Sequence, residues 1–152
     1  MSDHHERFMH IALAEAAQAA AEGEIPVGAV LVQGERILAQ THNRREQWND
    51  PTAHAELLAL REGAQKLGNR RLSDCTLYVT LEPCPMCAGA MVMACLGECF
   101  FGAIDERQGC CESVYSLPND PAFFWRVRCI GGLLAQESQK LLKAFFETRR
   151  AT

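Results

Sequence analysis

Two short polar segments, His54-Ala55-Glu56 and Pro83-Cys84-Pro85-Met86-Cys87, constrain the fold of this chain more than any other feature. Imidazole nitrogen and cysteine sulfur are ligands that zinc prefers in proteins, and a catalytic zinc site uses three of them and leaves a fourth position for water. His54, Cys84 and Cys87 supply three such ligands, and no nearby Cys or His has the paired spacing that a fourth would need. A site of this kind requires a fold that brings two distant segments together.

Both segments lie at expected helix starts. Asp50-Pro51-Thr52 is a helix-start signal, and it predicts a helix from about Thr52 to Leu67, ended by Gly68. A second helix is expected to begin near Pro85, so that Cys84 and Cys87 meet exposed amides that favour thiolates. Residues two apart in a helix interior point to nearly opposite sides. Near a helix terminus, however, the side chains of His54 and Glu56 can both reach one site.

The order H-x-E followed by P-C-x-x-C is the signature of zinc-dependent nucleobase deaminases. Two thiolates cancel the formal charge of Zn²⁺, so its water is acidified less than in a three-histidine site, and a nearby base is needed. We expect Glu56 to take the proton of zinc-bound water and to return protons to the ring nitrogen and the departing ammonia. A lone C-x-x-C is often a structural zinc corner, but the joint occurrence of both segments favours catalysis.

The remaining sequence predicts one α/β domain over 1–152. Apolar periodicity, alternation and turn residues indicate the order α-β-β-α-β-α-β-β-α, which implies a mixed sheet of about five strands with helices on both faces. Besides the helices above, the expected elements are helices over 3–22 and 136–150, strands over 27–32, 36–41, 75–80 and 99–103, and a weaker strand within 126–134. Residues 43–49 are expected to form a loop, and the long connection 104–125 is a candidate functional loop.

The composition excludes several classes of protein. A net charge of −4 argues against broad, nonspecific nucleic-acid binding, although Lys140, Lys143, Arg149 and Arg150 offer a local basic patch. The same cations also suit a helix C-terminus. With no signal peptide and no apolar segment of membrane-spanning length, the chain is expected in the cytoplasm, with its eight cysteines as reduced thiols and metal ligands.

The chain resembles bacterial tRNA adenosine deaminases of the TadA type, and the resemblance covers most of the sequence from Glu24 onward. It rests on the segments Glu24–Val30, Asn43, Asp50–Glu56, Thr76–Cys84, Met86–Met91, Phe101–Ala103 and Phe145-Phe146. The resemblance implies a three-layer cytidine deaminase-like fold, a homodimer, one zinc ion per subunit and no organic cofactor. It also implies that the wobble adenosine of a tRNA anticodon is converted to inosine.

Carried over by position, His54, Cys84 and Cys87 would hold zinc and Glu56 would shuttle protons. Asn43 would contact the flipped adenine, and Asp105 would lie near the ribose or the flanking nucleotides. The alternatives for these last two are an ordinary loop asparagine and a turn aspartate.

Three departures from the family concern the substrate more than the chemistry. Phe124-Trp125 stands where the family usually has Asn-His, Cys95 replaces a usual arginine, and Cys110-Cys111 fills a turn that relatives build from small residues. The cluster 123–125 could stack on unpaired bases, or it could be dimer interface or core.

Two other functions stay open on the sequence. One is a related deaminase of free bases or nucleosides of the guanine or cytosine type, which the net acidity and the missing Asn-His favour. The other is a non-catalytic, zinc-stabilised RNA-binding or dimerisation module, which the intact Glu56 disfavours.

Overall fold

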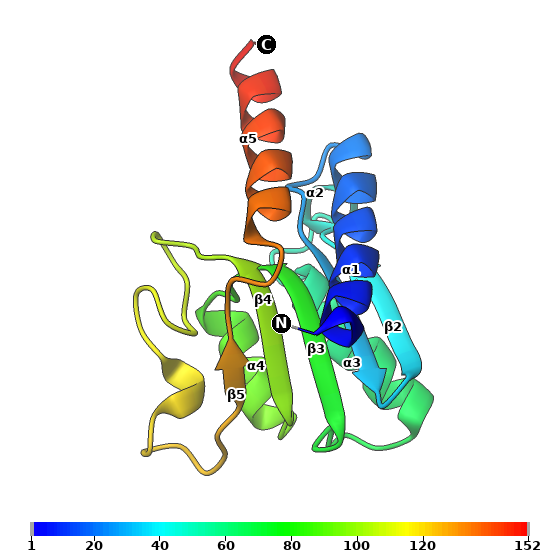
Figure 1. Cartoon of the computed structure of the whole chain (residues 1–152), viewed down its shortest axis with the longest axis vertical. Coiled ribbons are helices and arrows are strands. Elements are labelled where there is room, and N and C mark those ends of the chain that lie inside the picture. Colours follow the sequence, from blue (N-terminus) through cyan, green and yellow to red (C-terminus); the bar gives the residue numbers. More distant parts are fainter. Residues whose placement is uncertain (1, 152) are drawn as a thin grey trace.

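The computed structural model of this chain describes residues 2–151, with only the backbone at 150 and 151, and its centre is a five-stranded sheet (Figure 1). The strands are β1 (Gly28–Gln33), β2 (Arg36–His42), β3 (Cys75–Leu81), β4 (Glu98–Ala103) and β5 (Arg128–Ile130), in the spatial order β2-β1-β3-β4-β5. β1 is antiparallel to β2 and β3, whereas β3, β4 and β5 are parallel to one another. The predicted mixed sheet is confirmed.

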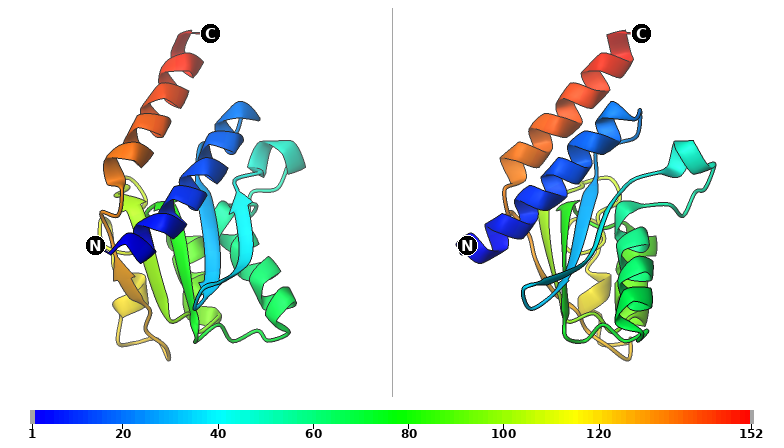
Figure 2. Two further views of the ribbon diagram at one scale, coloured as in Figure 1. Left: turned by 45° about the vertical axis from the view of Figure 1, so that its right-hand side comes forward. Right: turned by 90° about the vertical axis from the view of Figure 1, so that its right-hand side faces the viewer.

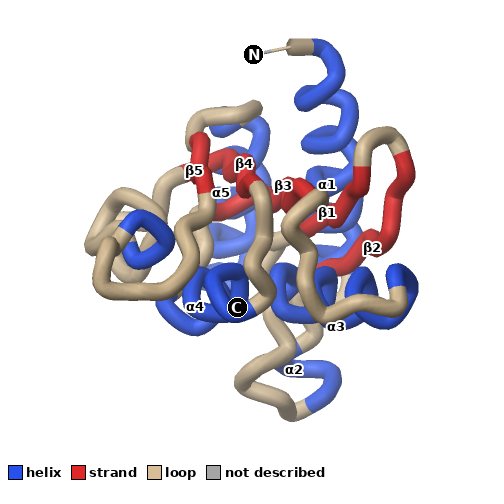
Figure 3. The backbone as a smooth tube through the Cα atoms, turned by 90° about the horizontal axis from the view of Figure 1, so that it is seen from below, coloured by secondary structure: helices blue, strands red, loops and turns tan. Residues whose placement is uncertain are grey.

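Helices cover both faces of the sheet (Figure 3). α1 (Asp3–Ala21) and α5 (Ala135–Ala151) lie on one face, and α3 (Ala55–Leu67) and α4 (Pro85–Met93) lie on the other. In β1, Ala29 and Leu31 point into the core beneath α3 and α4, while Val30 and Val32 point into the core beneath α1. A strand buried on both faces reads as a continuous apolar run, which is why β1 shows little alternation.

Gly28 allows α1 to pack closely against the start of β1. A Cβ atom there would lie 2.0 Å from the carbonyl oxygen of Ala12 and 2.6 Å from the backbone nitrogen of Ala16. Because backbone atoms cannot move aside as a side chain can, only glycine fits at this contact.

The crossover from β3 through α4 to β4 determines where the polar segments meet. The carboxyl ends of parallel strands emerge at the same edge of a sheet, and ligands bind in this position in many α/β folds. The chain leaving β3 runs directly into Glu82, whose backbone N–H donates to the carbonyl oxygen of Ala103 at the end of β4 (2.9 Å). The segments after β3 and β4 are therefore neighbours at one edge.

The helix expected from Thr52 begins three residues later, at Ala55. The prediction was wrong because the Asp50 carboxylate accepts hydrogen bonds from the N–H (2.8 Å) and the hydroxyl (2.7 Å) of Thr52. These bonds close a local turn ahead of the helix. His54 takes the N-cap position instead, with extended backbone angles (φ −78°, ψ 147°).

One other segment differs from expectation, because the predicted loop over 43–49 contains a short helix, α2 (Arg45–Trp48). The weaker final strand predicted within 126–134 is confirmed and covers Arg128–Ile130. The long connection after β4 includes one turn of 3₁₀ helix, η1 (Leu117–Asn119). These pieces are held by tertiary contacts and carry no periodic signal of their own.

The C-terminal helix α5 extends past the body of the molecule (Figures 1 and 2). Its apolar stripe is consequently only half-buried, and Phe146 keeps 43% of its surface exposed. None of the described helices has the length and apolar character needed to span a bilayer. None of the eight cysteines forms a disulfide, which agrees with the prediction of reduced thiols and metal ligands.

Candidate active site

Three ligand atoms converge where the N-termini of α3 and α4 meet. The imidazole of His54 and the thiols of Cys84 and Cys87 place one ligand atom each within 4.8 Å of the others, and His54 Nδ1 lies 3.6 Å from each sulfur. His54 caps α3, Cys84 caps α4 and Cys87 lies in the first turn of α4. The sequence prediction that these residues come together is correct in geometry.

The two thiols differ in how readily they ionise. A hydrogen bond from Cys87, reinforced by one from His54, lowers the pKa of Cys84 to about 4, so Cys84 is a thiolate. The pKa of Cys87 is raised, first because its proton is held by Cys84 and then because it is buried. One nitrogen and two sulfurs within this spacing match the donor set of zinc sites with an open position.

Glu56 reaches the same centre from the first turn of α3. Glu56 is 4% exposed, and burial raises the pKa of its carboxyl group to about 7. His54 and Glu56 are two positions apart, yet both face the centre because His54 lies outside the helical backbone. A carboxyl group that ionises near neutral pH can both accept and release a proton.

A pocket of about 760 Å³ opens onto this centre. Its floor is formed by His54, Glu56 and Cys84, and Asp105 lies on its wall with the three residues that follow. The lining also includes apolar residues from the segment before β1, from the end of β3 and from α5: Ile25, Val27, Leu81, Leu142 and Phe146. Polar groups set among apolar walls are typical of small-molecule sites.

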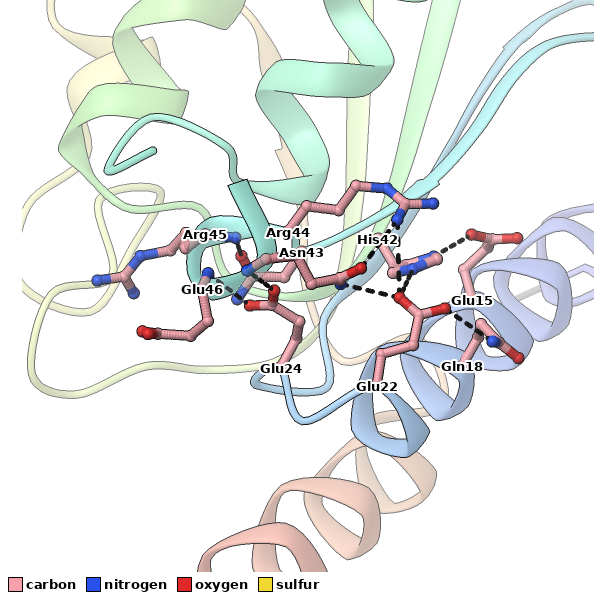
Figure 4. A network of polar contacts seen from close by, with 10 residues as sticks. Glu15, Gln18, Glu22, Glu24, His42, Asn43, Arg44, Arg45 and Glu46 are labelled. Carbon is pink, nitrogen blue, oxygen red and sulfur yellow. Dashed lines mark hydrogen bonds and ion pairs between the residues drawn. The ribbon is translucent and has the colours of Figure 1, made fainter. Parts of the chain in front are cut away.

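His42, at the end of β2, is anchored between two carboxylates of the first helix and its C-cap (Figure 4). Its Nδ1 lies 2.7 Å from a carboxylate oxygen of Glu15, and its Nε2 lies 2.9 Å from one of Glu22. The imidazole is 4% exposed, so these contacts are largely shielded from water. They fix the end of β2 immediately before Asn43.

Glu24 holds the other side of the same segment (Figure 4). The fully buried carboxylate accepts the backbone N–H groups of Glu46 (3.1 Å) and Gln47 (2.8 Å) at the start of α2. The side-chain oxygen of Asn43 accepts the N–H of Arg45 (3.2 Å), and both side chains line the pocket. Sequence reasoning assigned no role to Glu24 or Arg45, since neither stands in a pattern specific to a site.

Glu82 organises the opposite wall, and sequence reasoning also missed its role. Its buried carboxylate accepts five hydrogen bonds, from the backbone N–H groups of Asp105, Cys111, Glu112 and Ser113 and from the Ser113 hydroxyl. Burial opposes ionisation, but these donors outweigh it and lower the pKa of Glu82. A carboxylate directly before Pro83-Cys84 therefore ties the long connection to the segment that carries the thiols.

Arg149, one of the two predicted basic contacts, lies beside the pocket. Arg149 lines an adjoining hollow of about 150 Å³, where its guanidinium donates to the carbonyl oxygen of Gly23 and lies over the ring of Phe145 (4.7 Å to the centroid). Four residues are shared by the two hollows: Ile25, Asn43, Arg45 and Phe146. The side chain of Arg150, the other predicted contact, lies outside the described residues.

The aromatic segment 123–125 is divided between surface and interior. Phe123 and Phe124 are 45% and 68% exposed. Trp125 is partly buried, and its indole N–H donates to the carbonyl oxygen of Leu96 (2.9 Å). Among the described residues that line the pocket, none comes from this segment.

Comparison with known proteins gives concordant results. The sequence profile described as "Cytidine and deoxycytidylate deaminase zinc-binding region" matches residues 2–103. A tRNA-specific adenosine deaminase of Bacillus subtilis (strain 168) is 43% identical over 145 residues, which cover 95% of this chain and 90% of that protein.

Two solved structures of deaminases with different substrates match this chain to different extents. A structure from a study of A-to-I editing by tRNA:A34 deaminases superposes with a TM-score of 0.86 at 40% identity, covering 90% of this chain and 99% of that one. A guanine deaminase from Bacillus subtilis is also 40% identical, but its TM-score is 0.63 and the match covers 68% of this chain and 66% of that one.

Proposed function

The chain belongs to the zinc-binding cytidine and deoxycytidylate deaminase family and, within it, to the tRNA-specific adenosine deaminases, and we infer that it converts adenosine to inosine at wobble position 34 of a tRNA anticodon. The observation that carries the inference is the position of Glu56, buried against a His/Cys/Cys group on the floor of a pocket. A non-catalytic zinc module has no need of a buried carboxyl group that ionises near neutral pH.

His54, Cys84 and Cys87 would hold the zinc ion. When bound, zinc supplies Lewis acidity that makes a water molecule nucleophilic near neutral pH. The carboxylate of Glu56 removes a proton from the attacking water and delivers it to N1 of the adenine ring as C6 is attacked. The same carboxylate then takes the proton of the new C6 hydroxyl and passes it to the departing amine, so the C6–N bond breaks, ammonia leaves and inosine remains. A pKa of about 7 keeps both protonation states of Glu56 accessible during this exchange.

The walls of the pocket orient the nucleoside. A target base must leave its stack to reach this floor, and flipped bases are read by hydrogen bonds and apolar contacts. Asn43 is held by backbone contacts beside the centre, where its side-chain amide can bond the purine. Asp105 lies on the wall expected to face the ribose or the flanking nucleotides. Arg149 and Arg150 would contact the anionic backbone of the anticodon arm.

We further propose that the chain acts as a homodimer in the cytoplasm, where its tRNA substrate is found. Large apolar side chains are exposed on α4 and the connection 104–125, including Met93 (68%), Val114 (60%) and Phe124 (68%). A dimer interface would bury these side chains, and exposed apolar patches mark protein interfaces. A second copy covering them would account for Phe124 without a role in binding bases.

Deamination of free guanine or cytosine is the alternative. The guanine deaminase, which is equally identical in sequence, favours this alternative. Its structure, however, matches a smaller share of this chain and superposes less closely than the structure of the tRNA:A34 deaminase.

The test is direct. The zinc-loaded protein is incubated with an anticodon stem-loop that carries adenosine at position 34, with a matched stem-loop that carries adenosine one position away, and with free bases and nucleosides. Mass spectrometry should detect inosine only in the first stem-loop. Product from free compounds alone would refute the tRNA assignment.

A further inference from the structure

The short helix α2 lies at the rim of the pocket and carries side chains that the deaminase chemistry does not use. It projects from the body of the molecule beside the N-terminus of α3 (Figures 2 and 3). Its first residue, Arg45, lines both the pocket and the adjoining hollow. Its last residue, Trp48, follows about one helical turn later and is 52% exposed.

Tertiary contacts hold α2 in place although it has only four residues. The buried Glu24 carboxylate accepts the backbone N–H groups of Glu46 and Gln47. The side chain of Gln47 donates to a carboxylate oxygen of Glu22 (2.9 Å), and the Arg44 guanidinium lies 3.7 Å from the same oxygen. Because the backbone of α2 is already fixed, little conformational freedom is lost when a ligand binds to its outer side.

The indole of Trp48 is open to a partner. The guanidinium of Arg44 lies over the ring, 5.5 Å from its centroid. Among the described residues, only Arg44 places a cation or a ring against this indole. The other tryptophan, Trp125, is partly buried and its N–H donates to the carbonyl oxygen of Leu96. Trp48 therefore has an aromatic face that the fold itself does not use.

The cations near Trp48 indicate which kind of partner it fits. Residues three or four positions apart on a helix are neighbours, so Arg44 and Arg45 both lie near Trp48. The Nε atom of Arg45 is buried and has no hydrogen-bond partner among the described residues. An unpaired buried donor is costly, and an anionic oxygen entering the pocket would satisfy it. Single-stranded nucleic acid offers such oxygens together with bases that stack on aromatic rings.

We propose that Trp48 stacks on an unpaired base of the anticodon loop next to the adenosine that enters the pocket, and so favours a nucleotide strand over a free nucleoside. The inference rests on the proposed tRNA function and adds a residue to substrate binding. Asn43 and Arg45 line the pocket, and Trp48 follows them on the same short segment. A nucleotide flipped into the pocket brings its covalently linked neighbours to this rim. The guanidinium of Arg44 covers one face of the indole, and the base takes the other.

Stem-loop binding by zinc-loaded protein tests the proposal. Glu56→Gln serves as the parent, so that adenosine is not consumed during the titration. Trp48 and Trp125 are the only two tryptophans, and Trp125 does not line the pocket, so a change of fluorescence on binding reports on Trp48. Binding should quench this fluorescence. Trp48→Leu should raise the Kd about 5- to 150-fold, which corresponds to one base stacked on an aromatic ring. Trp48→Phe keeps a ring and should raise it less.

Two controls separate stacking from a general effect on the protein. In the otherwise wild-type chain, Trp48→Leu should leave kcat at saturating stem-loop, the zinc content and the melting temperature unchanged, because the exposed side chain lies outside the pocket lining. A set of stem-loops with one abasic loop position each then locates the base. At one of these positions, the parent and Trp48→Leu should bind with equal Kd.

Equal Kd values for Trp48→Leu and its parent on the intact stem-loop, or unchanged fluorescence on binding, would overturn the proposal. A difference in Kd that persists at every abasic position would do the same. So would an altered mass of Trp48→Leu in sedimentation, since Trp48 would then lie between two copies of the chain. If the wild type produces inosine at position 34 while Trp48→Leu binds normally, only this inference fails. If the wild type neither binds nor deaminates a stem-loop, the proposed function fails as well.

Discussion

Replacing Glu82 with glutamine tests whether one buried carboxylate holds the wall of the pocket together. The amide can present its single oxygen to the N–H groups of Cys111, Glu112 and Ser113, which share one carboxylate oxygen in the wild type. Its NH₂ group then faces the N–H of Asp105, which loses its acceptor. The Ser113 hydroxyl can rotate to accept in place of donating.

The cost follows from these contacts. One unpaired buried donor costs about 1–3 kcal/mol, and loss of the charge weakens the remaining bonds by about 1 kcal/mol more. The free energy of unfolding should therefore fall by about 2–4 kcal/mol in Glu82→Gln. For a chain of this size, that change lowers the melting temperature by roughly 4–16 °C.

Thermal denaturation followed by circular dichroism measures this shift on zinc-loaded protein. Glu112→Gln is the matched control, because it makes the same change of charge on an exposed side chain in the same segment and keeps the backbone N–H that Glu82 accepts. Equal melting temperatures for the two variants would show that Glu82 does not anchor the connection.

Four further changes probe the site and its supports. Glu56→Gln should retain zinc and lower kcat by about 10²–10⁴-fold, the usual contribution of a general acid–base group; metal analysis and single-turnover assays measure this, and undiminished turnover would exclude the proton shuttle. Asn43→Ala should lower kcat/KM for the stem-loop without loss of zinc, and an unchanged kcat/KM would remove Asn43 from substrate binding. Gly109→Ala should destabilise the protein, because the new Cβ would lie 2.3 Å from Cδ of Glu82 and 2.5 Å from the Asp105 carbonyl oxygen; a wild-type melting temperature would contradict this. Hydrogen bonds from Gln18 and His42 lower the pKa of Glu22 from 4.5 to about 2, so they stabilise the fold above pH 4.5 and this contribution disappears as the pH falls toward 2. In acid denaturation, the difference in unfolding free energy between wild type and Glu22→Gln should therefore shrink between pH 4.5 and 2. A constant difference would refute the role of these hydrogen bonds.

The deaminase assignment and the sheet could be predicted from sequence because their signals are local. Zinc ligands must be particular residue types at particular spacings, and the family membership that His54, Cys84 and Cys87 suggested is confirmed by the comparisons. The start of α4 was also predictable, since proline at the first helical position is a strong signal.

The start of α3 and the roles of Glu24 and Glu82 were not predicted from the sequence, because they depend on contacts that the local pattern does not reveal. Asp50-Pro51-Thr52 is a helix-start pattern. The Asp50 carboxylate, however, accepts hydrogen bonds from Thr52, and the helix begins later, at Ala55. Glu24 and Glu82 look like surface residues in the sequence, because nothing in their neighbours shows that distant backbone N–H groups will converge on them.

The meeting of two helix N-termini at one centre has a consequence for how the protein tolerates change. Each N-terminus carries a partial positive charge from its unpaired amides, so α3 and α4 repel one another where His54 and Cys84 cap them. The thiolate of Cys84 lies between the two ends and offsets this repulsion. A neutral residue such as serine in place of Cys84 should therefore move the two helix ends apart as well as weaken metal binding. The charge of this cysteine thus also supports the packing of α3 against α4.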